Sequence, residues 1–339
     1  MYFSHFGLRA RPFRTTPDVD AYYPATTHES ALAELRRALE DEEGLLLLSG
    51  EAGTGKTLLA HLLLDGMEEG TRSAFLTHGS YRKRSELLQA VLFDLGLPYQ
   101  EMNEQELRLA LTDSCLDYFK TDGPTVIVID EAHLLPLALV EELRLLSNLD
   151  GKDGKAVQIV LIGLPSILET IEQPGLKIFR QRLAVCFQLK PMSIEESADY
   201  LLHQLRRSGG RPEQLLGEDV LDILSHASRG IPRILNQAAH CAFTLARQSE
   251  SKTVDAEAAV EAVTRLGLDE GAEELTPIDQ QSAAPLSEDA PLPSISVAHR
   301  AIGNERPPVY IYGGASESND HAAEGPLPHT WQVPPQRVG

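Results

Sequence analysis

The segment that most constrains this chain is GEAGTGKT, from Gly50 to Thr57. Its pattern, G-x-x-x-x-G-K-T, is typical of a loop whose backbone N–H groups cradle phosphate groups. The glycines let the main chain turn tightly and approach phosphate oxygen atoms, because they carry no Cβ atom. A helix that begins directly after the loop adds the positive end of its dipole at the same point. The segment therefore predicts a binding site for a phosphorylated ligand.

Two side chains of the segment have an expected partner in such a ligand. We expect Lys56 to reach the outer two phosphates and Thr57 to offer its hydroxyl to Mg²⁺, which takes few protein ligands. The predicted nucleotide-binding set is Gly50, Glu51, Ala52, Gly53, Thr54, Gly55, Lys56, Thr57 and Leu58.

The flanking sequence argues against a chance glycine-rich turn. The apolar run Leu45 to Leu48 precedes the segment, as expected of a buried parallel strand. The leucines at 58, 59, 62 and 63 follow it with helical spacing. Strand, loop and helix therefore occur in the order that a phosphate loop requires.

Further strands and helices alternate up to residue 190, which predicts an α/β fold with a mostly parallel, doubly wound sheet between helices. The expected strands are 45–48, 73–77, 125–130 and 157–162, with a further strand-like stretch, AVCFQL, at 184–189. The expected helices are 28–39, with Thr26 or Thr27 as N-cap, 84–95, 104–120 and 134–149. We expect residues 1–190 to form one domain.

The chain changes character twice after this region. Residues 191–266 contain four helical segments with no strand between them, at 193–207, 218–228, 232–248 and 255–266, which predicts a small helical lid domain. Residues 267–339 hold ten of the 21 prolines and eleven acidic but three basic residues. This composition predicts a disordered acidic tail.

The N-terminal arm, residues 1–27, is rich in aromatic residues and interrupted by prolines. Two interpretations are open for its aromatic side chains. They could form a cover over a flat adenine base, or they could pack the arm against the core of the protein.

The net charge of −20 excludes a generally basic nucleic-acid-coating protein. A local basic patch is still compatible with it, and Tyr81 to Arg84 is a short basic run. The three cysteines are widely spaced and odd in number, which favours a reducing compartment over a disulfide framework or a metal site. There is no apolar signal-peptide region and no long apolar run, so we expect a cytoplasmic protein without an integral membrane segment.

A second group of candidate residues follows the strand TVIVI. Asp130 and Glu131 end this apolar run, about 75 residues after the glycine loop, as in the second half of a P-loop ATPase site. We expect Asp130 to hold Mg²⁺ and Glu131 to orient and polarise the attacking water. Adjacent carboxylates at a helix N-terminus are the alternative. The letters DEAH also occur in a class of helicases, but the other motifs of that class are missing.

Three arginines are candidates for contacting the γ-phosphate. Arg180 and Arg182 lie in FRQRL, and one of them could be an arginine finger supplied to a neighbouring subunit. Arg233, in GIPRILN, lies in the first turn of an expected helix and could reach back to the nucleotide. Surface salt bridges for the first two, and an exposed helix position for the third, are the alternatives.

With these features in place, the chain resembles AAA+ ATPases, and among them the ExeA or general secretion pathway protein A group. The matching stretches run in order from FGLRARPFRTTPD and HESALAEL through GEAGTGKT and VIVIDEAHLL to IVLIGLPSI, FRQRLAVCFQLKPMS and GIPRILNQAAHCAF, over about residues 1–266. The resemblance implies ATP binding and hydrolysis with catalytic roles for Lys56 and Glu131. It also implies Arg233 as the second sensor and an arginine finger in the FRQR segment. Transposition ATPases of the TnsC and TniB kind share this core.

The sequence departs from this family in two places. The first sensor after the strand IVLIG is usually polar, but here it is Leu164, which cannot hydrogen-bond the γ-phosphate or position water. Relatives of the secretion type continue into a membrane helix and a periplasmic peptidoglycan-binding domain, where this chain has the acidic stretch 267–339. A direct role in secretion is therefore not predicted.

The expected function is that of a Mg²⁺-dependent ATPase that couples its nucleotide state to oligomerisation or partner binding. We expect a homo-oligomer with shared nucleotide sites and a protein partner, with DNA as a further candidate. The alternative is a nucleotide-gated DNA-binding adaptor of the transposition type with little intrinsic ATP turnover.

Overall fold

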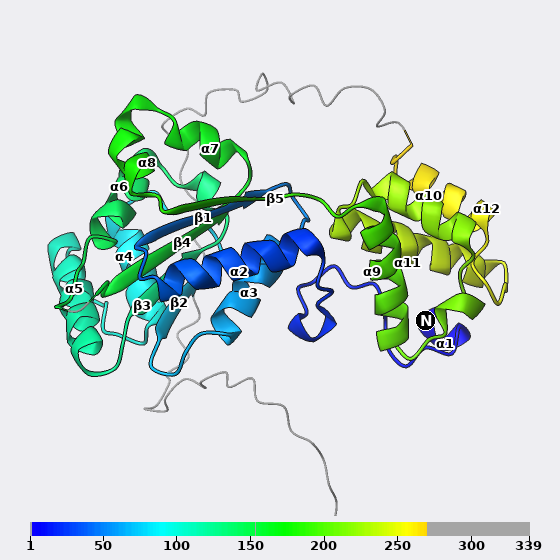
Figure 1. Cartoon of the computed structure of the whole chain (residues 1–339), viewed down its shortest axis with the longest axis horizontal. Coiled ribbons are helices and arrows are strands. Elements are labelled where there is room, and N and C mark those ends of the chain that lie inside the picture. The colour runs from blue at the N-terminus through cyan, green and yellow to red at the C-terminus, as the bar shows by residue number, and fades with distance from the viewer. Residues whose placement is uncertain (1, 153, 270–339) are drawn as a thin grey trace, which may run out of the picture. The chain divides into compact units, whose positions relative to one another are not determined.

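The computed structural model describes residues 2–152 and 154–269. Within this part the chain forms a five-stranded sheet in the order β2-β3-β4-β1-β5, and every neighbouring pair is parallel (Figure 1). The strands are β1 Leu45–Gly50, β2 Arg72–Leu76, β3 Thr125–Ile129, β4 Val157–Gly163 and β5 Val185–Leu189. The prediction of a parallel α/β sheet is confirmed.

Alternate residues of the central strands face two different helical layers, because successive side chains of a strand point to opposite faces of the sheet. Leu46 and Leu48 pack with the layer on one face, and Leu45 and Leu47 with the layer on the other. The first layer consists of α2 Thr26–Glu40 and α3 Lys56–Asp65. The second consists of α4 Arg84–Asp94, α5 Glu104–Thr121, α6 Leu137–Leu146, α7 Ser166–Ile171 and α8 Lys177–Arg182 (Figure 1).

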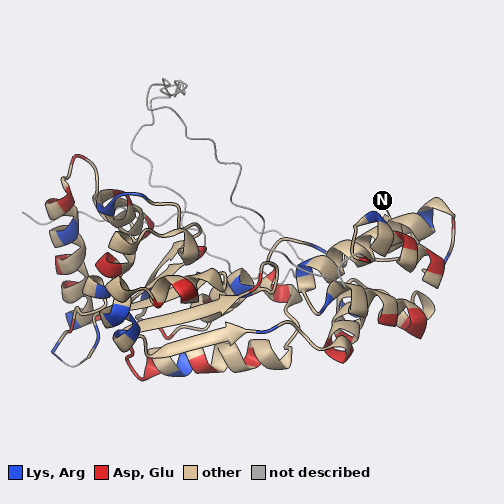
Figure 2. Ribbon diagram, turned by 90° about the horizontal axis from the view of Figure 1, so that it is seen from above, with Lys and Arg blue, Asp and Glu red and all other residues tan. Residues whose placement is uncertain are grey.

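Both faces of the sheet are therefore apolar. Strands β1, β3, β4 and β5 carry no Lys, Arg, Asp or Glu, and the charged residues lie on helices, loops and β2 (Figure 2). This explains why the strand segments read as continuous apolar runs rather than as alternating ones.

The helical region after the sheet has its own core. It consists of α9 Ile194–Arg207, α10 Glu218–Ser228, α11 Pro232–Gln248 and α12 Ala256–Arg265. A capping box begins α9, because the Ser193 side chain accepts the Glu196 N–H while the Glu196 carboxylate accepts the Ser193 N–H. Pro232 occupies the first turn of α11, where a missing N–H costs no hydrogen bond.

The N-terminal arm packs against this helical core. It contains α1 Tyr2–His5 and a 3₁₀ turn at Val19–Ala21. The rings of Tyr2, Phe6 and Phe13 are buried around Phe243 of α11, with centroid distances of 5.8, 5.0 and 5.5 Å. For these three residues the structure supports the packed-arm interpretation.

Several predicted boundaries differ from the structure. The helix expected at 134–149 is shorter, because a 3₁₀ turn at Ala132–Leu134 precedes it and Pro136 is the N-cap of α6. The N-cap of α2 is Ala25, not Thr26 or Thr27, which are already helical. The short helices α7 and α8 lack a long apolar period and were not predicted.

Of the predicted tail, residues 270–339 lie outside the described part of the chain. No helix among the described residues is long and apolar enough to cross a membrane.

Candidate functional site

The glycine loop connects β1 to the N-terminus of α3. Gly53 and Gly55 have φ values of +85° and +101°, in the left-handed region that favours glycine. Gly50 is required for a different reason, since a Cβ atom there would lie 2.9 Å from the backbone oxygen of Leu189 on β5. Of the remaining predicted residues, Glu51 and Ala52 are exposed, whereas Thr54 is buried, with Leu58 half-buried at the start of α3.

The side chain of Lys56 lies against the loop itself. Its Nζ donates hydrogen bonds to the backbone oxygens of Gly50 and Glu51, at 2.9 and 2.7 Å. Only 7% of the residue is exposed. Burial lowers the pKa of Lys56, and the nearby charges of Glu131 and Asp130 oppose this shift. An ammonium group is therefore held at the edge of the loop with carboxylates nearby.

Thr57 and Asp130, 73 residues apart in the sequence, meet at this edge of the sheet. Thr57 Oγ1 donates to Asp130 Oδ2 at 2.5 Å. The other carboxylate oxygen of Asp130 accepts the backbone N–H of Glu131 at 2.8 Å, and the residue is 4% exposed. A hydroxyl beside a buried carboxylate is a donor set that suits Mg²⁺, which prefers oxygen ligands and uses few from the protein. Across residues 2–152 and 154–269, no group of three or more His, Cys, Asp and Glu could hold a metal ion.

Glu131 has an unusual backbone conformation next to this pair. Its φ of +53° is left-handed, which is uncommon for a residue other than glycine. Its backbone oxygen packs on Gly79, where an added Cβ atom would lie only 2.3 Å away. The side chain is about half exposed, and its Oε2 atom lies 3.4 Å from Nδ1 of His133. The carboxylate of Glu131 thus lies beside one histidine.

His133 also contacts the end of β4, where the sequence has Leu164 in place of a polar residue. The backbone N–H of Leu164 donates to His133 Nδ1 at 3.4 Å. A single ring nitrogen thus lies within reach of both the Glu131 carboxylate and the Leu164 N–H. The nitrogen can serve only one of them at a time, since it must be protonated for the first and unprotonated for the second. His133 is not among the residues predicted from sequence, although its position two residues after Glu131 was a signal.

The three candidate arginines differ in position. The backbone N–H of Arg233, in the first turn of α11, donates to the backbone oxygen of Gly53 in the loop at 3.2 Å. Arg180 and Arg182 are exposed on α8, and Arg180 lies 3.3 Å from Glu172. Among the described residues, no hydrogen bond or ion pair joins either of these two to the loop. The structure therefore brings Arg233 to the site, but not Arg180 or Arg182 of the same chain.

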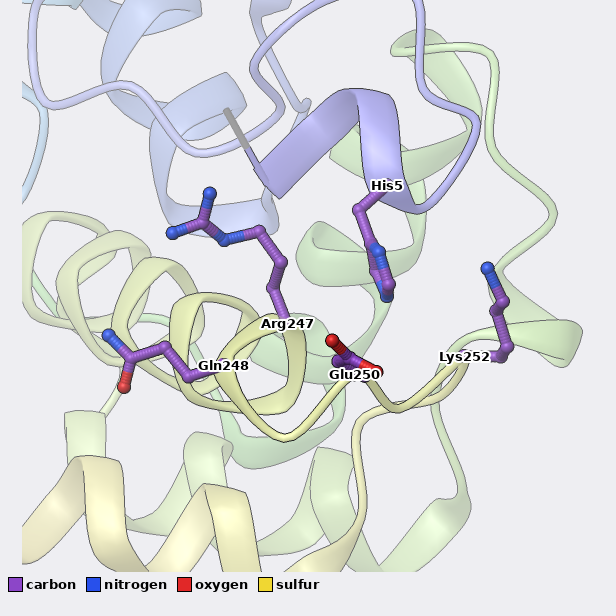
Figure 3. Close-up of a pocket in the computed structure, with 5 residues that line it drawn as sticks. All are labelled: His5, Arg247, Gln248, Glu250 and Lys252. Atoms are coloured by element: carbon purple, nitrogen blue, oxygen red, sulfur yellow. The ribbon is translucent and has the colours of Figure 1, made fainter.

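A separate concavity of about 420 Å³ lies at the end of α11 (Figure 3). Its lining combines cationic side chains with a carboxylate and is formed by His5, Arg247, Gln248, Glu250 and Lys252. His5 Nε2 lies 2.6 Å from the backbone oxygen of Ser251. No residue of the glycine loop lines this concavity, so it is not part of the phosphate site.

Comparison with known proteins agrees with this geometry. Residues 37–171 match the AAA domain family, over the glycine loop and the Asp130–Glu131 pair. Residues 37–171 therefore form a domain of the AAA family. It is also 35% identical, over 238 residues, to general secretion pathway protein A of Aeromonas hydrophila. That match covers 70% of this chain but only 43% of the relative. The predicted resemblance to this group is confirmed.

Solved structures support the fold. The chain is similar to the ORC1 protein of Aeropyrum pernix in complex with DNA, with a TM-score of 0.57 and 19% identity over 76% of this chain and 69% of that one. It is also similar to the ORC2 protein of the same organism in ADPNP–ADP complexes, with a TM-score of 0.54 and 14% identity over 69% and 66%. At these identities the likeness concerns the AAA+ fold.

Proposed function

We propose that this chain binds ATP with Mg²⁺, hydrolyses it, and uses its nucleotide state to control its assembly or its grip on a partner. The observation that carries the proposal is the 2.5 Å hydrogen bond between Thr57 Oγ1 and Asp130 Oδ2, directly beside Lys56. It joins the two sequence motifs that a P-loop ATPase needs on one edge of a parallel sheet.

Each side chain of the site has a proposed task. Lys56 exchanges its bonds to loop oxygens for phosphate oxygens, which attract an ammonium group more strongly than neutral carbonyls do. Thr57 and Asp130 would hold the metal ion, which supplies charge neutralisation of the phosphates when bound. Glu131, half exposed beside them, orients and polarises the attacking water. Arg233 extends from α11 towards the γ-phosphate.

We further propose that subunits share the nucleotide between them. Arg180 or Arg182 would act on the site of a neighbouring copy, because both are exposed on α8 and neither is joined to the loop of its own chain. In this arrangement residues 191–266 act as a lid whose position depends on the nucleotide. A protein partner and a cytoplasmic location complete the proposal.

The test is the ATP turnover of the purified protein, with and without Mg²⁺, beside the variants Lys56→Ala and Glu131→Gln. We expect Lys56→Ala to lose nucleotide binding, and Glu131→Gln to bind ATP but to lose turnover by about 10²-fold or more, as when a catalytic base is removed. Size measurements with ADP and with a slowly hydrolysed ATP analogue test the proposed assembly. Wild-type turnover equal to that of Lys56→Ala would exclude the ATPase proposal.

A second candidate function is that of a nucleotide-gated DNA-binding adaptor with little turnover. It is favoured by Leu164, whose side chain offers no hydrogen bond at the end of β4. The same experiment decides between the two when DNA is added. Tight ATP binding without turnover, together with ATP-dependent retention of DNA, would support the adaptor. Absence of both DNA retention and DNA stimulation would exclude it.

A further inference from the structure

A buried histidine contacts the phosphate loop from outside. His28, in the first turn of α2, has its Nε2 atom 2.7 Å from the backbone oxygen of Thr54. The residue is only 4% exposed, and burial lowers its pKa. A carbonyl oxygen can only accept a hydrogen bond, so Nε2 must carry the hydrogen and act as the donor. No role was predicted for this residue from sequence.

The bond determines the orientation of one peptide unit in the loop. Since a trans peptide is planar, the carbonyl of Thr54 and the N–H of Gly55 point in opposite directions. When His28 holds the carbonyl towards α2, the Gly55 N–H is turned away from α2. Among the described residues, no hydrogen bond uses this N–H. It is therefore available to a ligand in the cradle, together with the free N–H groups at the start of α3.

We propose that His28 is a positioning residue for phosphate binding, which fixes the Thr54 carbonyl so that the Gly55 N–H faces the ligand. The inference rests on the proposed nucleotide-binding function. It does not require His28 to touch the nucleotide. It assigns a cause to the orientation of the loop, namely a donor that lies 26 residues earlier in the chain.

The first turn of α2, which carries His28, is held by hydrogen bonds to other parts of the chain. The backbone N–H of Thr26 donates to Glu196 Oε1 at 2.7 Å, and Thr27 Oγ1 donates to the backbone oxygen of Lys190 at 3.2 Å. These bonds tie the first turn of α2 to the first turn of α9 and to the segment that leads into it. The loop is fitted closely to the ring as well, because a Cβ atom on Gly55 would lie 3.1 Å from His28 Nε2. The turn of α2 thus provides a defined position for the donor.

Two substitutions separate positioning from simple filling of space. His28→Leu keeps the approximate size of the side chain but makes it apolar and removes the donor. His28→Gln can instead place an amide N–H near the position of Nε2. A matched control is His240→Leu, because His240 packs against Tyr2 in the helical core and its Nδ1 atom has no hydrogen-bond partner. If His28→Leu does not fold, His28→Asn takes its place, since its amide is too short to reach Thr54.

The readouts are the dissociation constant for ADP and for a slowly hydrolysed ATP analogue, by calorimetry, and the melting temperature without nucleotide. We expect His28→Leu to bind at least about tenfold more weakly, as for the loss of a hydrogen bond to a buried carbonyl. We expect the dissociation constants of His28→Gln to stay within about threefold of those of the wild type. His240→Leu should change the melting temperature but not the affinity.

The outcomes are distinct. If His28→Leu binds nucleotide as tightly as the wild type, or His28→Gln binds as weakly as His28→Leu, the positioning role is overturned while the proposed function stands. If the wild type binds nucleotide but does not turn it over, the hydrolysis proposal fails and the affinities still decide the role of His28. If the wild type binds no nucleotide, both are overturned.

Discussion

The contact between the loop and α11 can be tested with Gly53→Ala. Two costs follow from the structure. First, an alanine at a φ of +85° costs about 1–2 kcal/mol, because its Cβ atom approaches the following carbonyl oxygen. Second, this atom would lie 2.7 Å from Arg233 Cβ and 3.2 Å from Ile231 Cγ2. Arg233 Cβ is attached to the backbone of α11, so relief requires the start of this helix to move away.

Such a movement would break the hydrogen bond from the Arg233 N–H to the Gly53 oxygen, at a cost of about 0.5–1.5 kcal/mol. The two terms together disfavour the native arrangement by about 1.5–3.5 kcal/mol, which corresponds to about tenfold to several-hundredfold weaker nucleotide binding. Calorimetric titration with ADP measures this directly. Gly7→Ala is a matched control, because Gly7 has a φ of +69° with no atom within 4 Å of the added Cβ. Wild-type affinity in Gly53→Ala would refute the reasoning.

Three further predictions concern single side chains. His133→Ala should lower ATP turnover but not ATP affinity, because His133 lies 3.4 Å from the Glu131 carboxylate. His133→Asn should recover part of the turnover rate. Equal single-turnover rates in the wild type and both variants would contradict this. Arg108→Met removes one of two guanidinium partners of Glu142, which is fully buried. Its free energy of unfolding in urea should fall by about 1–3 kcal/mol, and an unchanged midpoint would show that the pair contributes nothing. Because burial lowers the pKa of His28 below its ordinary 6.5, the folded protein binds fewer protons than the unfolded chain as the pH falls through that value. The free energy of unfolding should therefore decrease from pH 7.5 to 5.5. His28→Gln should reduce the slope of this free energy against pH by up to about 1.4 kcal/mol per pH unit. The same slope in both proteins would contradict this.

Much of the candidate site could be predicted from sequence because it depends on local patterns. An apolar strand, a glycine-rich turn and an amphipathic helix follow one another in the sequence, so the loop and Lys56 could be placed without long-range information. The pairing of Thr57 with Asp130 could also be predicted, since the carboxyl ends of parallel strands lie at the same edge of a sheet. The structure brings these two side chains together across β4, which lies between β1 and β3.

The features that the sequence left open or did not reveal depend on contacts between distant parts of the chain. Tyr2 and Phe13 pack on Phe243, more than 200 residues later, and no local period in the arm reveals this partner. From sequence alone, His28 is one more residue of an amphipathic helix, because its contact with the loop depends on tertiary structure. His133 belongs to a recognisable motif, but its contact with Leu164 depends on how β4 ends beside β3.

These distant contacts also explain which backbone groups of the loop already have hydrogen-bond partners. The carbonyl of Gly53 accepts the Arg233 N–H from α11, and the carbonyl of Thr54 accepts a hydrogen bond from His28 on α2. Two consecutive carbonyls of the loop are therefore bound by donors from outside it, and among the described residues no hydrogen bond uses the Gly55 N–H, which is left for an anion. A movement of α11 would release the Gly53 carbonyl and weaken this arrangement. Nucleotide affinity and the position of the helical region should accordingly be coupled, each favouring the other by the same free energy.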